Sequence, residues 1–158
     1  MTTTNAMRLL TQAGIAYEPL AYAYDESDLS GTHAAAALGL DPDATFKTLV
    51  LRGEKAGLFV CCIPVAEEVD PRKAAKAMGE KKAELLHVKE LLSATGYIRG
   101  GCSPVGMKKR LPTFIDETAQ LFERIAVSAG VRGQMLLLGP DELTTYVGAS
   151  YADLTRVD

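Results

Sequence analysis

The chain has 158 residues, of which 47% are hydrophobic and 23% charged, enough for one globular domain with a substantial buried core. Its formal net charge of −3 argues against indiscriminate nucleic-acid binding. No apolar run reaches the length of a membrane span, and the start, MTTTNAMRLL, lacks the order of a signal peptide, so we expect a cytoplasmic protein with no membrane contact.

Cysteine and histidine offer little material for a metal site or a catalytic triad. Cys61 and Cys62 are adjacent and Cys102 stands alone, so no pair has the spacing of zinc ligands. An odd number of cysteines without a secretion signal favours reduced thiols. His33 and His87 are the two histidines. We therefore expect neither a metal nor another cofactor.

The N-terminal region predicts two helices separated by extended chain. Thr4 can cap a first helix that ends at Gly14. Residues 15–24 then read as extended chain, in which Pro19 predicts an edge strand or an interruption. A short alanine-rich helix is expected over residues 32–39.

The clearest strands come next, over residues 44–52 (ATFKTLVLR) and 58–65 (LFVCCIPV). The loop between them, GEKAG, has the length of a hairpin connection. Asp70 followed by Pro71 predicts the start of a helix, because a capping side chain precedes proline at the first helical position. A further helix is expected over residues 88–96.

The C-terminal third predicts short strands and one late helix. We expect strands at residues 113–116, 125–129, 134–139 and 151–154 and a helix at residues 140–148. Strands and helices alternate without a regular βαβ rhythm, so the expected fold is α+β, a single compact domain with a mixed, largely antiparallel sheet. Rossmann and P-loop glycine motifs are absent from the sequence.

One loop concentrates glycine and positive charge. Residues 96–112, GYIRGGCSPVGMKKRLP, hold four glycines, two prolines and four cations, and no acidic residue occurs between Leu91 and Ile115. Such a loop can present consecutive N–H groups to an anion or a developing oxyanion. A tight connection between strands with a solvated basic face explains the same residues, and both interpretations stay open here.

Lys47 lies inside a strand pattern and also has two explanations. Strand alternation places it on one face with Leu49 and Leu51, and Phe46 and Val50 on the other. It can be an edge-strand lysine that opposes aggregation. It can equally rise into a pocket, where a cation neutralises a phosphate or an oxyanion and burial lowers its pKa.

Cys102 stands in the glycine-rich loop and invites a nucleophilic interpretation. An active thiolate needs a base, a cation or a helix N-terminus nearby, and Arg99 is the nearest candidate in sequence. We therefore expect a buried bystander thiol, with a thiol enzyme as the alternative.

These segments together resemble a known family. FKTLV, IPVAEEVDPRKAAKAMGEKKAEL, TGYIRGGCSPVGMKKRLPTFID and IAVSAGVRG are similar to the YbaK/ProX family, free-standing relatives of the editing domain inserted in bacterial prolyl-tRNA synthetases. The similarity covers nearly the whole chain, so one editing domain is expected over residues 1–158. Within the family, the chain resembles the Cys-tRNA(Pro)/Cys-tRNA(Cys) deacylase type.

The resemblance implies a fold, a reaction and a set of site residues. The fold is a compact α+β domain with a barrel-like sheet and surrounding helices, and the reaction releases a wrong amino acid from tRNA. The residues implied in catalysis are Lys47, Gly100 and Gly101. Those expected at the substrate are Tyr22, Ser30, Thr48, Ser103, Ser128 and Gly130. Those expected at tRNA are Arg99, Lys108, Lys109 and Arg110.

The family also implies a mechanism in which the thiol of a cysteinyl substrate attacks its own ester. The expected partner is the acceptor end of mischarged tRNA, with prolyl-tRNA synthetase as a second partner. Ser30 and Met135, which follows the Arg132-Gly133-Gln134 turn, depart from the family pattern at expected pocket positions. Removal of alanine or serine by water, and a non-catalytic module that binds aminoacyl-tRNA or a synthetase, stay as alternatives. The oligomeric state is left open.

Overall fold

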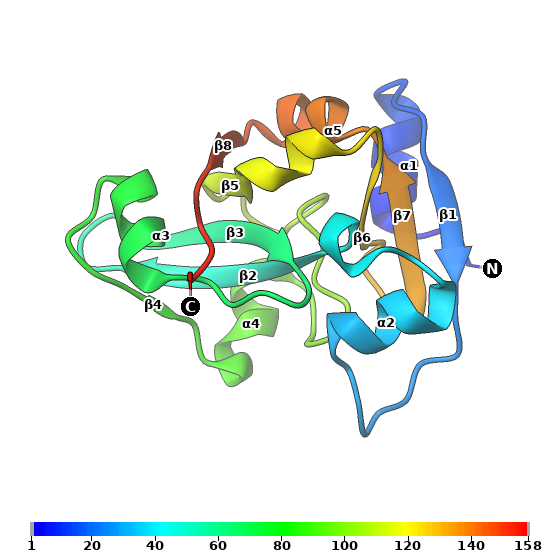
Figure 1. Ribbon diagram of the computed structural model, residues 1–158, viewed down its shortest axis with the longest axis horizontal. Helices are drawn as coiled ribbons and strands as arrows, with labels where there is room; N and C mark the ends of the chain where they lie inside the picture. The colour runs from blue at the N-terminus through cyan, green and yellow to red at the C-terminus, as the bar shows by residue number, and fades with distance from the viewer. Residues whose placement is uncertain (1, 158) are drawn as a thin grey trace.

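Two β-sheets form the centre of the molecule in a computed structural model that describes residues 2–157 (Figure 1). The larger sheet has the strand order β4-β2-β3-β5-β8. In it, β4, β2 and β3 are antiparallel neighbours, whereas β3–β5 and β5–β8 are parallel. Its strands are β2 (Phe46–Gly53), β3 (Leu58–Pro64), β4 (Ala83–Leu85), β5 (Thr113–Asp116) and β8 (Ser150–Ala152).

The smaller sheet has the order β1-β7-β6 and is antiparallel throughout. Its strands are β1 (Glu18–Ala21), β6 (Ile125–Ser128) and β7 (Gln134–Leu138). A parallel bridge between Thr45 and Ala126 joins the two sheets at the start of β2. The expected α+β fold with a mixed, largely antiparallel sheet is confirmed. The barrel-like part of that expectation is corrected, since pairings among residues 2–157 leave two open sheets.

Within residues 2–157, five short α-helices surround the sheets, and capping residues set their ends. The Thr4 hydroxyl accepts from the Met7 N–H at the first helix, and the Asp70 carboxylate accepts from the Arg72 N–H at the third. Gly96 ends its helix at a φ of 84°, a left-handed conformation that favours glycine. The helices are α1 (Asn5–Gln12), α2 (Gly31–Leu38), α3 (Pro71–Met78), α4 (Val88–Thr95) and α5 (Pro140–Val147), with 3₁₀ helices η1 (Pro42–Ala44) and η2 (Glu117–Leu121).

These ends agree with the sequence expectations to within a residue or two. The alanine-rich helix begins at Gly31, because Ser30 supplies its cap. Three short elements were not predicted: the strand β4 and the two 3₁₀ helices, η1 and η2. The strand β4 has only three residues, which is too short for an alternation pattern, and it forms by pairing with the distant β2. Each α-helix has eight residues, so no helix in residues 2–157 is long and apolar enough to cross a membrane.

Alternation along β2 divides two hydrophobic cores. Phe46 and Val50 belong to the core shared with β6, β7 and α5. Leu51 belongs to a second core with Phe59 of β3 and residues of α3. The predicted two faces of this strand are therefore confirmed, with Phe46 and Val50 on one and Leu49 and Leu51 on the other.

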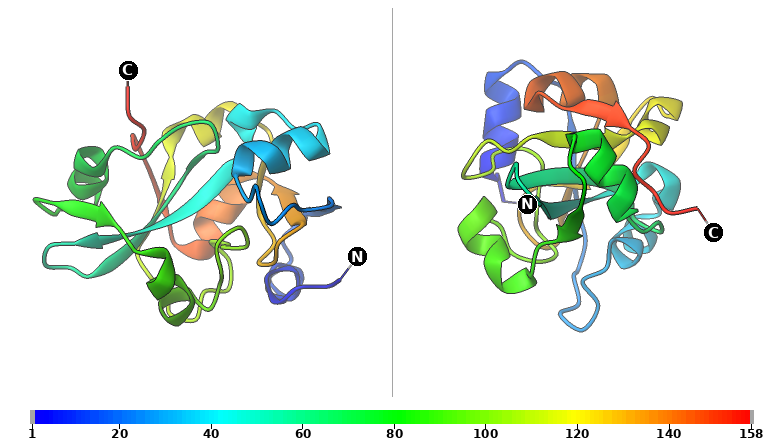
Figure 2. Two further views of the ribbon diagram at one scale, coloured as in Figure 1. Left: turned by 90° about the horizontal axis from the view of Figure 1, so that it is seen from below. Right: turned by 90° about the vertical axis from the view of Figure 1, so that its left-hand side faces the viewer.

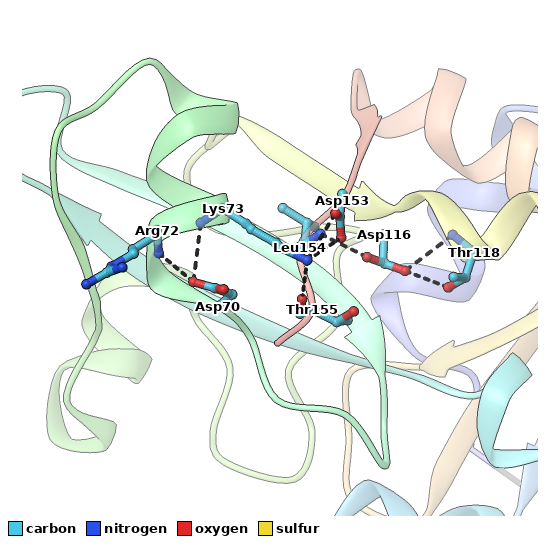
Figure 3. A network of polar contacts seen from close by, with 8 residues as sticks. All are labelled: Asp70, Arg72, Lys73, Asp116, Thr118, Asp153, Leu154 and Thr155. Carbon is cyan, nitrogen blue, oxygen red and sulfur yellow. Dashed lines mark hydrogen bonds and ion pairs between the residues drawn. The ribbon is translucent and has the colours of Figure 1, made fainter. Parts of the chain in front are cut away.

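The C-terminal segment is tied to α3 and β5 by a polar network (Figure 3). The buried Asp116 carboxylate accepts from the Leu154 N–H at 3.0 Å and from the Thr118 hydroxyl at 2.6 Å. Lys73 Nζ donates to the Thr155 carbonyl at 2.8 Å and pairs with Asp153 at 3.0 Å. This network fixes the chain end against the larger sheet, away from the cavity described below.

Candidate functional site

A cavity of about 420 Å³ opens beside β2. In Figure 1 and in the right-hand view of Figure 2, α2 and α4 both lie below β2, and these helices supply part of the cavity wall. The loop after α4 and the ends of β6 and β7 complete it. Most of the lining is apolar, from Leu29, Ala34, Phe46, Leu49, Val50, Val65, Leu85, Leu86, Val88, Leu91 and Met135.

Lys47 is a half-buried cation in the wall of this cavity. Burial lowers the pKa of its ammonium, while the carboxylates of Glu68 and Glu67 act in the opposite direction. This placement agrees with the pocket explanation for Lys47. A cation held there at reduced hydration interacts strongly with any negative charge that enters the cavity.

Gly100 brings bare backbone to the cavity. Its φ is +87°, and a Cβ at this position would lie 3.3 Å from the Leu29 side chain, so a larger residue is both strained and crowded. Within residues 2–157, the N–H groups of Gly100 and Cys102 donate to no protein acceptor. Since both residues line the cavity, these two groups are candidate donors to a ligand.

Gly101 has a different position from its neighbour. Its N–H donates to the Ile98 carbonyl at 3.0 Å, and the residue does not line the cavity. A Cβ on Gly101 would lie 3.1 Å from the backbone of Val131 and Arg132. Gly101 is therefore the point at which its loop packs against the loop of Val131 and Arg132, and its N–H is hydrogen-bonded within the protein.

Tyr97 and Arg132 hold those two loops together, and sequence reasoning singled out neither. The Tyr97 hydroxyl donates to the Val105 carbonyl at 2.6 Å. A Cβ on Gly130 would lie 3.0 Å from the Tyr97 ring, so the ring packs directly on that glycine. Arg132 Nε donates to the Arg99 carbonyl at 2.9 Å. The only sequence signal was an aromatic residue within a glycine-rich loop.

Four of the expected substrate residues line the cavity: Tyr22, Ser30, Thr48 and Ser128. Partial burial raises the pKa of the Tyr22 phenol. The Ser128 hydroxyl accepts from the Gly130 N–H at 3.1 Å, and Ser30 caps α2. Arg99, expected at tRNA, also contributes to the wall.

Two expected substrate residues lie outside the lining. Ser103 is fully buried, and its hydroxyl accepts from the Val105 N–H at 3.2 Å, so it shapes the loop from within. Gly130 lies beneath the Tyr97 ring, as described above, with a φ of +102°. Both residues support the walls of the cavity and do not face it.

The basic triplet also lies apart from the cavity. Lys108, Lys109 and Arg110 are exposed, and the last two line a separate cavity of about 260 Å³ with Leu9 and Tyr146. Gly148 caps the C-terminus of α5, and a Cβ added to it would lie 2.7 Å from Nη2 of Arg110, so this guanidinium lies close to the end of the helix. A cation is favourable at that end of a helix, so Arg110 has a structural role as well.

Cys102 is a buried thiol in the cavity wall. Burial raises its pKa to about 11, and a hydrogen bond with Thr95 only partly offsets this. A thiolate is therefore scarce near neutral pH, which disfavours Cys102 as a nucleophile. Residues 2–157 contain no group of three or more His, Cys, Asp or Glu side chains that could hold a metal ion.

Comparison with known proteins gives concordant matches. A family model described as "Aminoacyl-tRNA editing domain" matches residues 30–146. The chain is 45% identical over 152 residues to an Enterococcus faecalis protein named "Putative Cys-tRNA(Pro)/Cys-tRNA(Cys) deacylase EbsC", covering 96% of this chain and 93% of that one. It is 32% identical over 126 residues to the proline–tRNA ligase of Shouchella clausii, covering 78% of this chain and 21% of the ligase.

The fold matches a solved structure over its whole length. A crystal structure described as "a putative trans-editing enzyme for prolyl tRNA synthetase" superimposes with a TM-score of 0.80 at 24% identity. The match covers 99% of this chain and 100% of the other. At this identity the match establishes a shared fold.

Proposed function

The chain belongs to the aminoacyl-tRNA editing domain family, and from that premise we propose that it removes cysteine from mischarged Cys-tRNA(Pro) in trans. The proposal treats residues 1–158 as one editing domain, working in the cytoplasm on the acceptor end of the tRNA. The similarity to a relative named for Cys-tRNA deacylation supports the choice of cysteine.

The observation that carries the proposal is that Lys47 lines one apolar cavity together with Gly100 and Cys102, whose N–H groups have no acceptor within residues 2–157. A volume of about 420 Å³ lies within the range of small-molecule sites and suits an aminoacyl group with part of the terminal adenosine. Most of the polar groups in the wall are neutral, so the site favours a small uncharged side chain on the bound amino acid.

Among the described residues, the buried Cys102 thiol that lines this cavity has a raised pKa and no histidine or lysine side chain is hydrogen-bonded to a lining hydroxyl, so we assign the attack to the substrate. The cysteinyl sulfur forms a bond to its own ester carbonyl carbon while the ester C–O bond breaks. The tRNA 3′-oxygen leaves and takes a proton, and a four-membered thiolactone is released. Holding sulfur and carbonyl in near-attack geometry supplies about 7 kcal/mol or more in favourable intramolecular reactions.

The protein's contribution is to position these atoms and to stabilise charge. The Gly100 and Cys102 N–H groups donate to the developing oxyanion, and losing one such donor typically costs about 3 kcal/mol. The Lys47 ammonium favours the substrate thiolate and holds the phosphate or ribose of the terminal adenosine. Ser128 and Tyr22 contact the amino acid and its ribose.

A prolyl-tRNA synthetase is the proposed partner that supplies the identity of the tRNA. The similarity to a proline–tRNA ligase supports a common substrate, tRNA(Pro), for this chain and that class of enzyme. Since the net charge is −3, phosphate contacts alone give weak tRNA binding, which leaves selection of the tRNA to the synthetase.

The test is incubation with Cys-, Ser- and Ala-tRNA(Pro), followed by identification of the products. We expect Cys-tRNA(Pro) to be deacylated fastest and to give the thiolactone or its hydrolysis product. Ser-tRNA(Pro) should react more slowly, because its hydroxyl is a poorer nucleophile than sulfur at similar size. Equal rates for cysteine and serine would assign the reaction to water instead. Binding of all three without release would make the chain a binding module.

A further inference from the structure

Exposed apolar side chains are concentrated at one edge of the cavity. Leu85, Val88 and Leu92 are 53%, 59% and 57% exposed. Val88 and Leu92 are four residues apart on α4 and so share one face of the helix, and Leu85 ends β4 just before it. Leu85 and Val88 also line the cavity. We call these three residues the α4 platform.

Basic residues lie on and beside this platform. Lys89 is exposed on α4 itself, and the exposed Arg99 follows the helix in the loop that lines the cavity. Glu90 of the same helix is already paired with Arg52 at 3.2 Å. The Lys108 N–H donates to the Thr95 carbonyl at 2.8 Å, which places this cation at the C-terminal end of α4.

An apolar surface bordered by cations has the chemistry of a site for single-stranded nucleic acid. Bases contribute planar apolar faces, and phosphates contribute the charge that lysine and arginine neutralise. The substrate ester is carried on the terminal ribose. When the ester lies in the cavity, the nucleotides before it must leave through the mouth.

We propose that the α4 platform binds the unpaired nucleotides that precede the terminal adenosine of the substrate tRNA. This inference rests on the proposed function, because it takes the cavity as the site of the aminoacyl ester. It assigns Leu92, which lies outside the cavity lining, a role in substrate affinity. Lys89 and Lys108 meet the phosphates of the same segment.

The test compares Leu92→Ser with Leu121→Ser, a matched change at a residue 79% exposed on η2. In Figure 1, η2 (yellow) lies on the opposite side of the molecule from α4. Leu92→Ser should raise KM for Cys-tRNA(Pro) about fivefold with kcat unchanged, and Leu92→Tyr should lower KM, since base stacking on an aromatic ring is favourable. Leu121→Ser should change neither constant.

A second substrate isolates the role of the preceding nucleotides. With 3′-cysteinyl-adenosine, which lacks them, Leu92→Ser should behave as wild type. An unchanged KM for Cys-tRNA(Pro) in both Leu92 variants would overturn the inference. So would a wild-type dimer in sedimentation that Leu92→Ser dissociates, because the platform would then be covered by a second copy of the chain.

Failure of the proposed function would be visible separately. In that case wild type would release cysteine from neither substrate. The platform would then be judged from fluorescence anisotropy with a single-stranded RNA ending in CCA. Weaker binding by Leu92→Ser than by Leu121→Ser would support the platform, and equal binding would overturn it.

Discussion

The clamp formed by Tyr97 can be tested by removing a single oxygen atom. Tyr97→Phe keeps the ring that packs on Gly130 but deletes the hydroxyl that donates to the Val105 carbonyl at 2.6 Å. Val105 is fully buried. Leaving a buried acceptor without its donor costs about 1–3 kcal/mol. For a chain of this length, that corresponds to a fall in Tm of about 2–12 °C.

The control is Tyr17→Phe, which makes the same chemical change at the surface. The Tyr17 hydroxyl lies 3.2 Å from that of Thr11 in an exposed pair, so its loss should change the free energy of unfolding by no more than about 0.5 kcal/mol. Urea unfolding of the two variants measures the difference. Burial, with a smaller contribution from Cys102, raises the pKa of Tyr97 to about 12, so the hydroxyl keeps its proton in the folded protein. The difference should persist from pH 6 to 9 and shrink above about pH 10, where an unfolded tyrosine ionises.

The same substitution should also affect catalysis. Because Tyr97 fixes the loop that carries Gly100 and Cys102, Tyr97→Phe should lower kcat for Cys-tRNA(Pro) more than it raises KM. A Tyr97→Phe protein as stable and as active as Tyr17→Phe would refute the claim that this hydrogen bond holds the cavity wall.

Three further outcomes follow from the geometry. Asp116→Ala should lower the free energy of unfolding in urea titrations by about 3 kcal/mol or more, because it removes buried hydrogen bonds to a carboxylate. Asp153→Ala, which removes an exposed ion pair, should lower it by less than about 1 kcal/mol. Cys102→Ala should keep most deacylase activity. Iodoacetamide should modify native Cys102 very slowly at pH 8, because a thiol of pKa about 11 is then only about one part in a thousand thiolate. Lys108→Ala with Lys109→Ala should reduce the salt dependence of tRNA binding by about two units of slope in anisotropy titrations; an unchanged slope would place both lysines on solvated surface.

Local sequence signals were enough to locate most helices and strands. These signals act within a few residues of the element they define, so they can be recognised in the sequence alone. They are the alternation in β2, the capping residues Thr4 and Asp70, and the glycine at the end of α4. The strand β4 could not be found this way, because its three residues become a strand only through their pairing with β2.

In the candidate site too, local features could be predicted from the sequence, whereas features that depend on tertiary packing could not. Residue type and pattern made Lys47 and Gly100 candidates with two explanations each, the family resemblance implied their place in the site, and both line the cavity. The sequence could not distinguish Gly100 from Gly101, because the difference depends on Val131, thirty residues away, against which Gly101 packs. The apolar wall from α2 and α4 is equally a product of tertiary packing.

The basic triplet illustrates a further limit of sequence reasoning. Lys108, Lys109 and Arg110 follow the glycine loop closely and were grouped with it for that reason. Between them, Pro104 and Val105 are buried and Gly106 adopts a φ of +78°, so the chain turns before it reaches the cations. Nearness in sequence did not bring these side chains to the cavity.

Lys47 gives the most direct test of the central claim, that this cavity removes cysteine from tRNA. Lys47→Met keeps the stem of the side chain and removes its charge, with Lys55→Met in the β2–β3 hairpin as the matched control. Since folding lowers the Lys47 pKa, the cation opposes folding at neutral pH; this cost begins to fall as pH rises through the folded pKa and is gone only above the ordinary lysine pKa. The Lys47→Met protein should therefore be at least as stable as wild type near pH 7.

The decisive measurement is the rate of release of radiolabelled cysteine from Cys-tRNA(Pro) by wild type, Lys47→Met and Lys55→Met at pH 7. The account predicts rapid release by wild type and Lys55→Met, and release at the uncatalysed rate by a folded Lys47→Met. Full activity in Lys47→Met would contradict it, because catalysis would then proceed without the cation in the cavity.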